Sequence, residues 1–242
     1  DAGAKEVTTC EMNKSIAKIA KTIITKNGYG DRIKVFNKKS TELKLGIEIK
    51  QKADLLISEI FSSELVGEGI QASLLDAKNR LLKENGKIIP EAGEIKLALL
   101  KSNARINEEC FAGIFKKYDL SDFNQITGNK FSFKTNDIEI STLSENLTAF
   151  SFDFSTNNII EKKQNIIDIQ VNETGICLGL ITWMKIDLYQ KIYLENDPSS
   201  NKKMHWPTPV YTFGQPLKVL KGEKIKIKAT LLKDKIWFEL IK

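Results

Sequence analysis

Two glutamates, Glu59 and Glu68, stand nine residues apart in the stretch L-L-I-S-E-I-F-S-S-E-L-V-G-E-G, which covers residues 55–69. A short apolar run precedes Glu59, and glycines flank Glu68 ahead of a helical pattern. Ligands of open α/β sheets bind beyond the carboxyl ends of the strands, so a glutamate at a strand end and another at a loop end can face one crevice. Two carboxylates suit a planar cation, because a guanidinium offers five N–H donors in a fixed fork.

The same stretch also fits a strand, a surface loop and a helix N-terminus whose acidic residues lie near the positive end of the helix dipole. Spacing alone leaves both interpretations open. The elements around the two glutamates are needed to choose between them.

The 242 residues allow one large domain or two modest ones, each with a hydrophobic core. No run of eighteen apolar residues is present, and the first residues, D-A-G-A-K-E, lack the basic and apolar regions of a signal peptide. We therefore expect a cytoplasmic protein. Cys10, Cys110 and Cys177 are far apart and form no C-x-x-C, which argues against a disulfide framework and against a metal site.

The formal net charge of +6 raises the question of a nucleic-acid partner. Only three of the 37 basic residues are arginine, and the lysines are spread through the chain. A dispersed lysine excess more often solvates a surface than forms a binding stripe, so we expect no nucleic-acid partner.

The first part of the chain alternates strand and helix patterns. Strands are expected at residues 6–10, 33–36 and 55–58. One helix is capped by Asn13 and stopped by Asn27-Gly28, with an apolar stripe of Ile16, Ile19, Ala20, Ile23 and Ile24. A second helix has Ile70, Leu74, Ala77 and Leu81 facing the core and is expected to end at Asn85-Gly86. Such alternation predicts a parallel α/β arrangement.

Glu11 follows the first expected strand. In Rossmann-type folds an acidic residue roughly 20 residues after a glycine-rich loop bonds a ribose hydroxyl. Glu11 occupies such a place, and counting back from it leads to a point before Asp1. The glycine-rich loop is therefore expected to be missing from this sequence.

From Pro90 onward the pattern changes to strand-like runs rich in β-branched and aromatic residues. These runs are residues 94–100, 131–133, 149–154, 166–171, 176–186, 210–213, 224–232 and 236–240, with a hairpin turn at 232–235. Strands without intervening helices predict an antiparallel structure closed into a barrel or sandwich.

Residues 104–122 interrupt these strands and are expected to be helical or irregular. Their apolar residues would lie on one helical face, which must bury against something: Ile106, Cys110, Phe111, Ile114 and Phe115. This pattern predicts a homodimer, although the segment could also fold back onto its own sheet.

The sequence resembles the protein arginine N-methyltransferases over essentially its whole length. The stretch S-E-I-F-S-S-E-L-V-G-E-G is similar to the double-E loop of that family, and M-H-W-P-T-P is similar to the loop named after its Thr-His-Trp signature. The sequence of this loop is most similar to the branch that makes only monomethylarginine. That branch roughly shares Ile60-Phe61, whereas dimethylating branches carry Trp-Met there.

The resemblance implies a partial Rossmann-like S-adenosylmethionine-binding half at residues 1–89. An antiparallel β-barrel would follow at residues 90–242, with a helical dimerisation arm inserted at about 104–128. It also implies that the family's N-terminal helices, first strand and glycine-rich motif are absent here. The 242 residues alone are then expected neither to bind the methyl donor nor to methylate an arginine-rich peptide.

The resemblance also assigns site residues. Glu59 and Glu68 would hold the substrate guanidinium, with Glu68 as eventual proton acceptor and His205 at the active-site wall. Phe61 and Trp206 would line the arginine channel. Glu11, with Met12 beside it, would bind the donor's ribose, and Ser40 and Thr41 would lie near the adenine.

Three function classes stay open from the sequence. The first is an enzyme that methylates arginine in protein substrates. The second is a non-catalytic relative, retained as a dimerising or binding module after loss of the donor site. The third is a methyltransferase that acts on another nucleophile. The missing glycine-rich loop favours the second class. The glutamate pair favours the first, because a non-catalytic relative has no physical need for two convergent acids.

Overall fold

The computed structural model describes residues 2–134, 139–200 and 204–241, and the chain divides into two compact units. One unit comprises Asp1–Ser58 and Gln71–Ile89, and the other comprises Glu59–Ile70 and Pro90–Lys242. The loop that carries the two glutamates therefore packs with the second unit, although both of its neighbours in sequence belong to the first.

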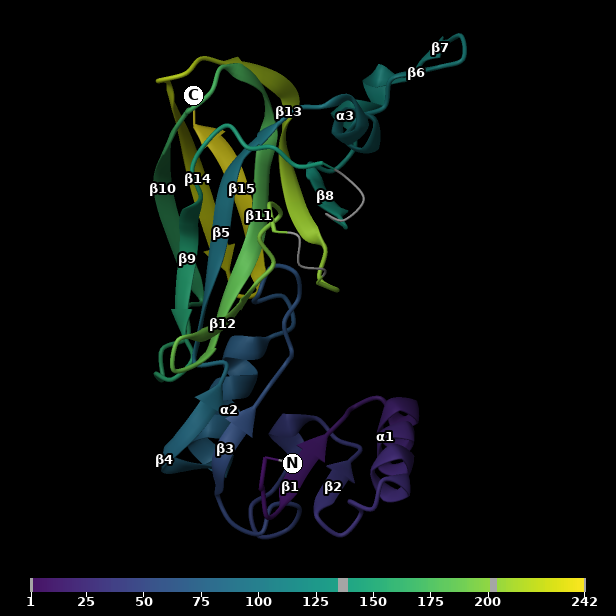
Figure 1. Ribbon diagram of the computed structural model, residues 1–242, viewed down its shortest axis with the longest axis vertical. Helices are drawn as coiled ribbons and strands as arrows, with labels where there is room; N and C mark the ends of the chain where they lie inside the picture. The colour runs from purple at the N-terminus through teal and green to yellow at the C-terminus, as the bar shows by residue number, and fades with distance from the viewer. Residues whose placement is uncertain (1, 135–138, 201–203, 242) are drawn as a thin grey trace. The chain divides into compact units, whose positions relative to one another are not determined.

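The first unit is built from short parallel strand pairs and helices (Figure 1). Its elements in chain order are β1 (Val7–Cys10), α1 (Lys14–Lys26), β2 (Ile33–Phe36), the 3₁₀ turn η1 (Ser40–Glu42), β3 (Ala53–Ile57), α2 (Ile70–Leu81, of which Ile70 belongs to the second unit) and β4 (Leu82–Ile89). Strand β1 pairs in parallel with β2, and β3 pairs in parallel with β4. The predicted parallel α/β pattern is thus confirmed for these residues.

Helix α1 begins as the sequence predicts. The Asn13 side chain accepts hydrogen bonds from the amides of Ser15 and Ile16 at 3.0 and 3.2 Å, and Asn27 caps the other end. The apolar stripe is present, but its outer residues Ile16, Ile19 and Ile23 are 53, 59 and 55% exposed. Only Ala17 of this helix is buried.

Helix α2 buries the four predicted positions, whose exposed fractions run from 0% at Ile70 to 7% at Leu81. The expected stop at Asn85-Gly86 is wrong, because the helix ends at Leu81 and β4 follows directly. Leu82 pairs with Ala53 and Lys87 with Leu55, so the register shifts between them. The Asn-Gly pair lies inside that irregularity, where parallel pairing with β3 overrides a turn.

The second unit is dominated by antiparallel strands. These are β5 (Ala92–Lys101), β8 (Lys130–Phe133), β9 (Leu147–Asp153), β10 (Lys162–Gln170), β11 (Gly175–Tyr189), β12 (Ile192–Glu195), β13 (Thr208–Val219), β14 (Lys224–Leu232) and β15 (Lys235–Ile241). Every predicted strand of this half overlaps one of them, and residues 224–232 coincide with β14. The predicted turn at 232–235 joins β14 to β15, with Lys233 at φ 56°.

Pairings among the described residues form a six-stranded sheet and a three-stranded sheet. The larger has the order β8-β13-β11-β5-β9 with β12 on β11, and the smaller has the order β10-β14-β15. Side chains connect both edge strands of the smaller sheet, β10 and β15, to the larger sheet. The Asn165 amide of β10 donates to the Ala149 carbonyl of β9 at 2.7 Å, and Tyr211 of β13 packs on Phe238 of β15 with ring centroids 4.8 Å apart.

The segment after β5 is partly helical and partly irregular, as the sequence predicts. Helix α3 (Ala104–Cys110) is short, and a hairpin of β6 (Ile114–Phe115) and β7 (Tyr118–Asp119) follows, then the 3₁₀ turn η2 (Ser121–Gln125). Ile106 and Cys110 are buried in the unit's own core, whereas Ile114 and Phe115 are 78 and 62% exposed. The single apolar helical face is therefore wrong, because Gly113 and the hairpin divide the apolar residues between core and surface.

Candidate active site

The loop Glu59–Ile70 is held by its apolar residues. Phe61, Leu65, Val66 and Ile70 are at most 6% exposed. Leu65 has φ 65°, a left-handed conformation that is uncommon for a branched side chain. A Cβ added at Gly93 of β5 would lie 2.8 Å from a Leu65 methyl carbon, so glycine is required there for the loop to approach the sheet.

The two predicted glutamates lie at the ends of this loop. The Glu59 side chain is 64% exposed, and Glu68 is also exposed. Within the described residues Glu68 has no hydrogen-bond or ion-pair partner. Both carboxylates are therefore open to a ligand, while the residues between them fix the loop.

The His205-Trp206 segment, which directly precedes β13, lies against the first part of the loop. The imidazole Nε2 of His205 is 3.9 Å from a carboxylate oxygen of Glu59. The His205 and Trp206 ring centroids are 3.8 Å apart, and those of Trp206 and Phe61 are 5.9 Å apart. Both members of the Glu59–His205 pair are exposed, so this contact adds little stability, but it brings together four residues predicted as site residues.

The four residues predicted to bind the donor lie in the first unit. Glu11 follows the carboxyl end of β1, and its amide donates to the Phe36 carbonyl at the end of β2. One carboxylate oxygen of Glu11 accepts from the Asn13 amide at 2.6 Å, and the other has no partner within the described residues. Met12 is 68% exposed, and Ser40 and Thr41 form η1 after β2. A free carboxylate oxygen at the carboxyl edge of parallel strands suits a ribose hydroxyl.

Glu64 was not predicted as a site residue. It lies midway along the loop, and its carboxylate binds Tyr211 of β13 and Lys130 of β8. A charged residue between Phe61 and the Leu65-Val66 pair was a usable signal, since a charge enclosed by buried residues requires partners.

Comparisons with known proteins show the family of this chain. Residues 104–240 match the family described as "Arginine methyltransferase oligomerization subdomain". The chain belongs to the protein arginine N-methyltransferase family. The resemblance drawn from the double-E loop and the His205-Trp206 pair is thereby confirmed at the family level.

Two curated relatives show how far the similarity extends. The arginine Nω-methyltransferase of Streptomyces achromogenes is 30% identical over 94% of this chain and 62% of its own length. Protein arginine N-methyltransferase 7 of Aedes aegypti is 30% identical over 81% of this chain and 31% of its own length. The chain thus spans less than two thirds of these relatives. The second relative's name fits the branch that the sequence resembles.

The fold is also similar to a solved structure, the Trypanosoma brucei PRMT1 enzyme–prozyme heterotetrameric complex with AdoHcy. The TM-score is 0.81 at 19% identity, over 98% of this chain and 76% of that one. Within the part of the chain that the structure describes, no helix is both long and apolar enough to cross a membrane.

Proposed function

We propose that this chain provides the arginine-binding part of a protein arginine N-methyltransferase that uses S-adenosylmethionine. The observation that carries the proposal is the meeting of the glutamate loop with the His205-Trp206 segment, at 3.9 Å between Glu59 and His205. An exposed carboxylate beside an aromatic pair, with a second exposed carboxylate on the same loop, is a suitable site for a guanidinium, which carries charge and has a flat face.

Methyl transfer to a guanidinium nitrogen is an in-line displacement, so the protein mainly has to hold and align the nucleophile. Glu59 and Glu68 accept the guanidinium N–H donors and leave lone-pair density on one nitrogen. They also stabilise the positive charge shared in the transition state. Glu68 takes the proton after transfer, while Phe61 and Trp206 form the wall along which the arginine side chain enters.

The donor, when bound, supplies a methyl group on a sulfonium. Glu11 would hold its ribose through the free carboxylate oxygen, with Met12 alongside. Ser40 and Thr41 would lie near its adenine. These residues fit a nucleoside because they follow the carboxyl ends of two paired parallel strands, β1 and β2.

The product is proposed to be monomethylarginine. After Glu59 the chain carries Ile60-Phe61, as the monomethylating branch roughly does, and Phe61 is buried against the loop and near Trp206.

We propose that the strands of the second unit close into a barrel and that this unit mediates dimerisation. The side-chain contacts that join β9 to β10 and β13 to β15 support a barrel, because they bring both edges of the smaller sheet to the larger one. The exposed apolar hairpin β6–β7 and the family match over residues 104–240 support a homodimer.

The proposal is tested in the natural full-length protein with Glu68→Gln. This change keeps the side-chain shape but removes a charge that matters most in the transition state, so turnover is expected to fall on the order of 10²-fold or more. Donor binding, measured by calorimetry, is expected to stay nearly unchanged. Glu11→Ala is expected to have the reverse effect, with donor binding as the property that is weakened most directly.

Glu173→Gln serves as the control, because Glu173 pairs with Lys101 in the same unit and contacts neither the loop nor the His205-Trp206 segment. It is expected to leave turnover unchanged. Equal loss of donor affinity in Glu68→Gln and Glu11→Ala would show that the roles are wrongly assigned. Unchanged methylation by Glu68→Gln would overturn the proposed function.

A further inference from the structure

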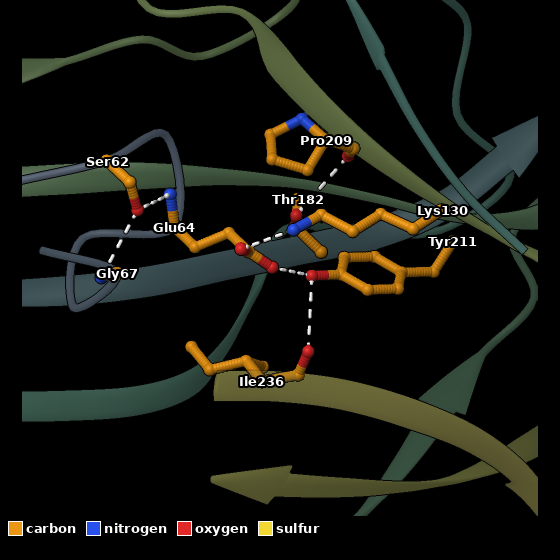
Figure 2. Close-up of polar contacts among 8 residues, drawn as sticks. All are labelled: Ser62, Glu64, Gly67, Lys130, Thr182, Pro209, Tyr211 and Ile236. Atoms are coloured by element: carbon orange, nitrogen blue, oxygen red, sulfur yellow. Dashed lines mark hydrogen bonds and ion pairs between the residues drawn. The ribbon is translucent and has the colours of Figure 1, made fainter. Parts of the chain in front are cut away.

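The loop Glu59–Ile70 contains a hydrogen-bonded turn at its middle (Figure 2). The Ser62 hydroxyl oxygen accepts from the amides of Glu64 and Gly67, both at 3.2 Å. The Leu65 amide donates to the Ser62 carbonyl at 2.9 Å. A Cβ at Gly67 would lie 2.2 Å from the Ser62 hydroxyl oxygen, so this turn requires glycine next to Glu68.

The Glu64 carboxylate leaves this turn and binds the larger sheet with both oxygens, as Figure 2 shows. The Tyr211 hydroxyl donates to one oxygen, and the Lys130 ammonium pairs with the other. Lys130 and Tyr211 are direct cross-strand partners on β8 and β13. Two adjacent side chains of one strand pair therefore hold both oxygens of a single carboxylate.

These partners are themselves fixed. The Tyr211 ring packs edge-on against Phe238 of β15, and the Lys130 ammonium lies 5.8 Å from the centre of the Tyr211 ring. The Glu64 side chain is only 15% exposed, against 64% for Glu59. A largely buried carboxylate is costly unless it is paired and hydrogen-bonded, so Glu64 strongly favours this one arrangement.

Glu64 lies five residues after Glu59 and four before Glu68. Its attachment to β8 and β13 therefore fixes the loop between the two carboxylates. The pairing with Lys130 also neutralises the middle carboxylate, so it does not compete with Glu59 and Glu68 for a cation. The loop carries three glutamates, one bound to the sheet and two open to a ligand.

We propose that Glu64 is a positioning residue for arginine, acting with Lys130 and Tyr211 to hold the Glu59 and Glu68 carboxylates at a fixed separation. The inference rests on the proposed function for its kinetic consequence, but the attachment of the loop does not. Bidentate recognition depends on the separation of the acceptors, so loosening the loop weakens binding of an arginine without touching the donor site.

The first test measures the loop directly, by amide hydrogen exchange of residues 59–70 in the full-length protein. Glu64→Gln is expected to raise exchange of the Leu65 and Gly67 backbone amides about tenfold. The neutral side-chain carboxamide can accept from the Tyr211 hydroxyl but cannot form an ion pair with Lys130. Tyr211→Phe, which keeps the packing on Phe238, is expected to raise it less. Unchanged exchange in both variants would overturn the inference.

The second test is a double-mutant cycle on arginine-peptide methylation with Glu64→Gln and Lys130→Met. Each single change is expected to raise KM for the peptide about tenfold with donor affinity unchanged. The double variant is expected to be no worse than either single variant, because both remove the same contact. Lys130→Arg keeps the positive charge, so its KM for the peptide is expected to lie closer to that of the parent protein than to that of Lys130→Met.

Glu173→Gln is again the matched control, since it removes an ion pair of the same kind elsewhere in the second unit. It is expected to change neither exchange in the loop nor KM. Additive effects in the cycle, or an equal loss of donor affinity, would overturn the positioning role. Raised exchange in Glu64→Gln together with no methylation by the parent protein would leave the attachment standing and overturn the proposed function instead.

Discussion

Two irregular segments of the second unit differ in the exposure of their apolar residues. In the loop Glu59–Ile70, Phe61, Leu65 and Val66 are buried, and the exposed residues include Glu59 and Glu68. In the segment 111–126 the exposed residues include large apolar and aromatic side chains, with exposed fractions of 55–80% at Ile114, Phe115, Tyr118, Phe123 and Ile126. Both segments interrupt regular elements, and both carry residues that the core does not use.

The difference separates two tasks that a loop can perform. Burying apolar residues fixes the backbone and leaves charged groups in defined places, which suits recognition of a small cation. Exposing apolar residues leaves surface that gains free energy only against another surface, which suits association. The same unit therefore has one segment whose apolar residues are buried and one segment that exposes apolar surface.

The largest expected effect comes from breaking the buried anchor of the loop. Leu65→Ala is expected to lower the free energy of unfolding by about 3 kcal/mol, because Leu65 is fully buried and its removal leaves a cavity beside Gly93. Alanine meets the same backbone strain at φ 65°, so the loss reports packing alone. Urea unfolding followed by tryptophan fluorescence measures it.

Ile126→Ala is the contrasting variant, because Ile126 is 80% exposed. Its effect on the free energy of unfolding is expected to stay within about 0.5 kcal/mol. Equal effects of the two variants would remove the distinction between the anchored loop and the exposed segment.

Much of the second unit could be predicted from sequence, since its strands are long and rich in β-branched residues. Strand β14 was predicted at its observed bounds, and β11 was identified from Ile176 to Ile186. Sequence also predicts that the loop and the His205-Trp206 segment belong to one site, and the structure brings Glu59 to 3.9 Å from His205. Their proximity depends on long-range pairing of β13 with β11, which no local pattern encodes.

The failures have local physical causes. Asn85-Gly86 has strong turn propensity, but it lies inside β4, which pairs with β3. The pairing register shifts at this place and the strand continues. Apolar spacing in residues 104–115 matched a helix, but the chain turns after Cys110 and places Ile114 and Phe115 on a hairpin. Glu64 was missed because its partners, Lys130 and Tyr211, are far away in sequence.

A smaller effect is expected at the tip of the exposed segment. Ile114→Ser is expected to weaken self-association about tenfold, because it removes an apolar side chain that gains free energy only on burial in an interface. Light-scattering mass measured over a dilution series reports the change. Ile192→Ser on β12 is the control, since Ile192 is 64% exposed and lies outside this segment. A parent protein that stays at the mass of one subunit at micromolar concentration would contradict the prediction.

The smallest expected effect concerns the base of the same segment, where Cys110 is buried and the hairpin tip is not. Burial, with a smaller contribution from Glu109, raises the pKa of the Cys110 thiol from 9.0 to about 11. The folded state therefore keeps this proton at pH values at which the unfolded state has lost it. Stability from this thiol is fully present below pH 9 and is lost as the pH rises towards 11, by about 1 kcal/mol at pH 10.

Cys110→Ala removes this dependence. The difference in the free energy of unfolding between parent and variant is expected to be constant near pH 7 and to narrow as the pH rises through 9 towards 11, because only the parent has the Cys110 thiol, which ionises first in the unfolded state. A cysteine introduced at the tip by Ile114→Cys is expected to react with a maleimide at neutral pH, while Cys110 stays unmodified. Rapid modification of Cys110 in the folded parent would show that the base of the segment is as open as its tip, and the contrast with the anchored loop would then hold for the whole segment.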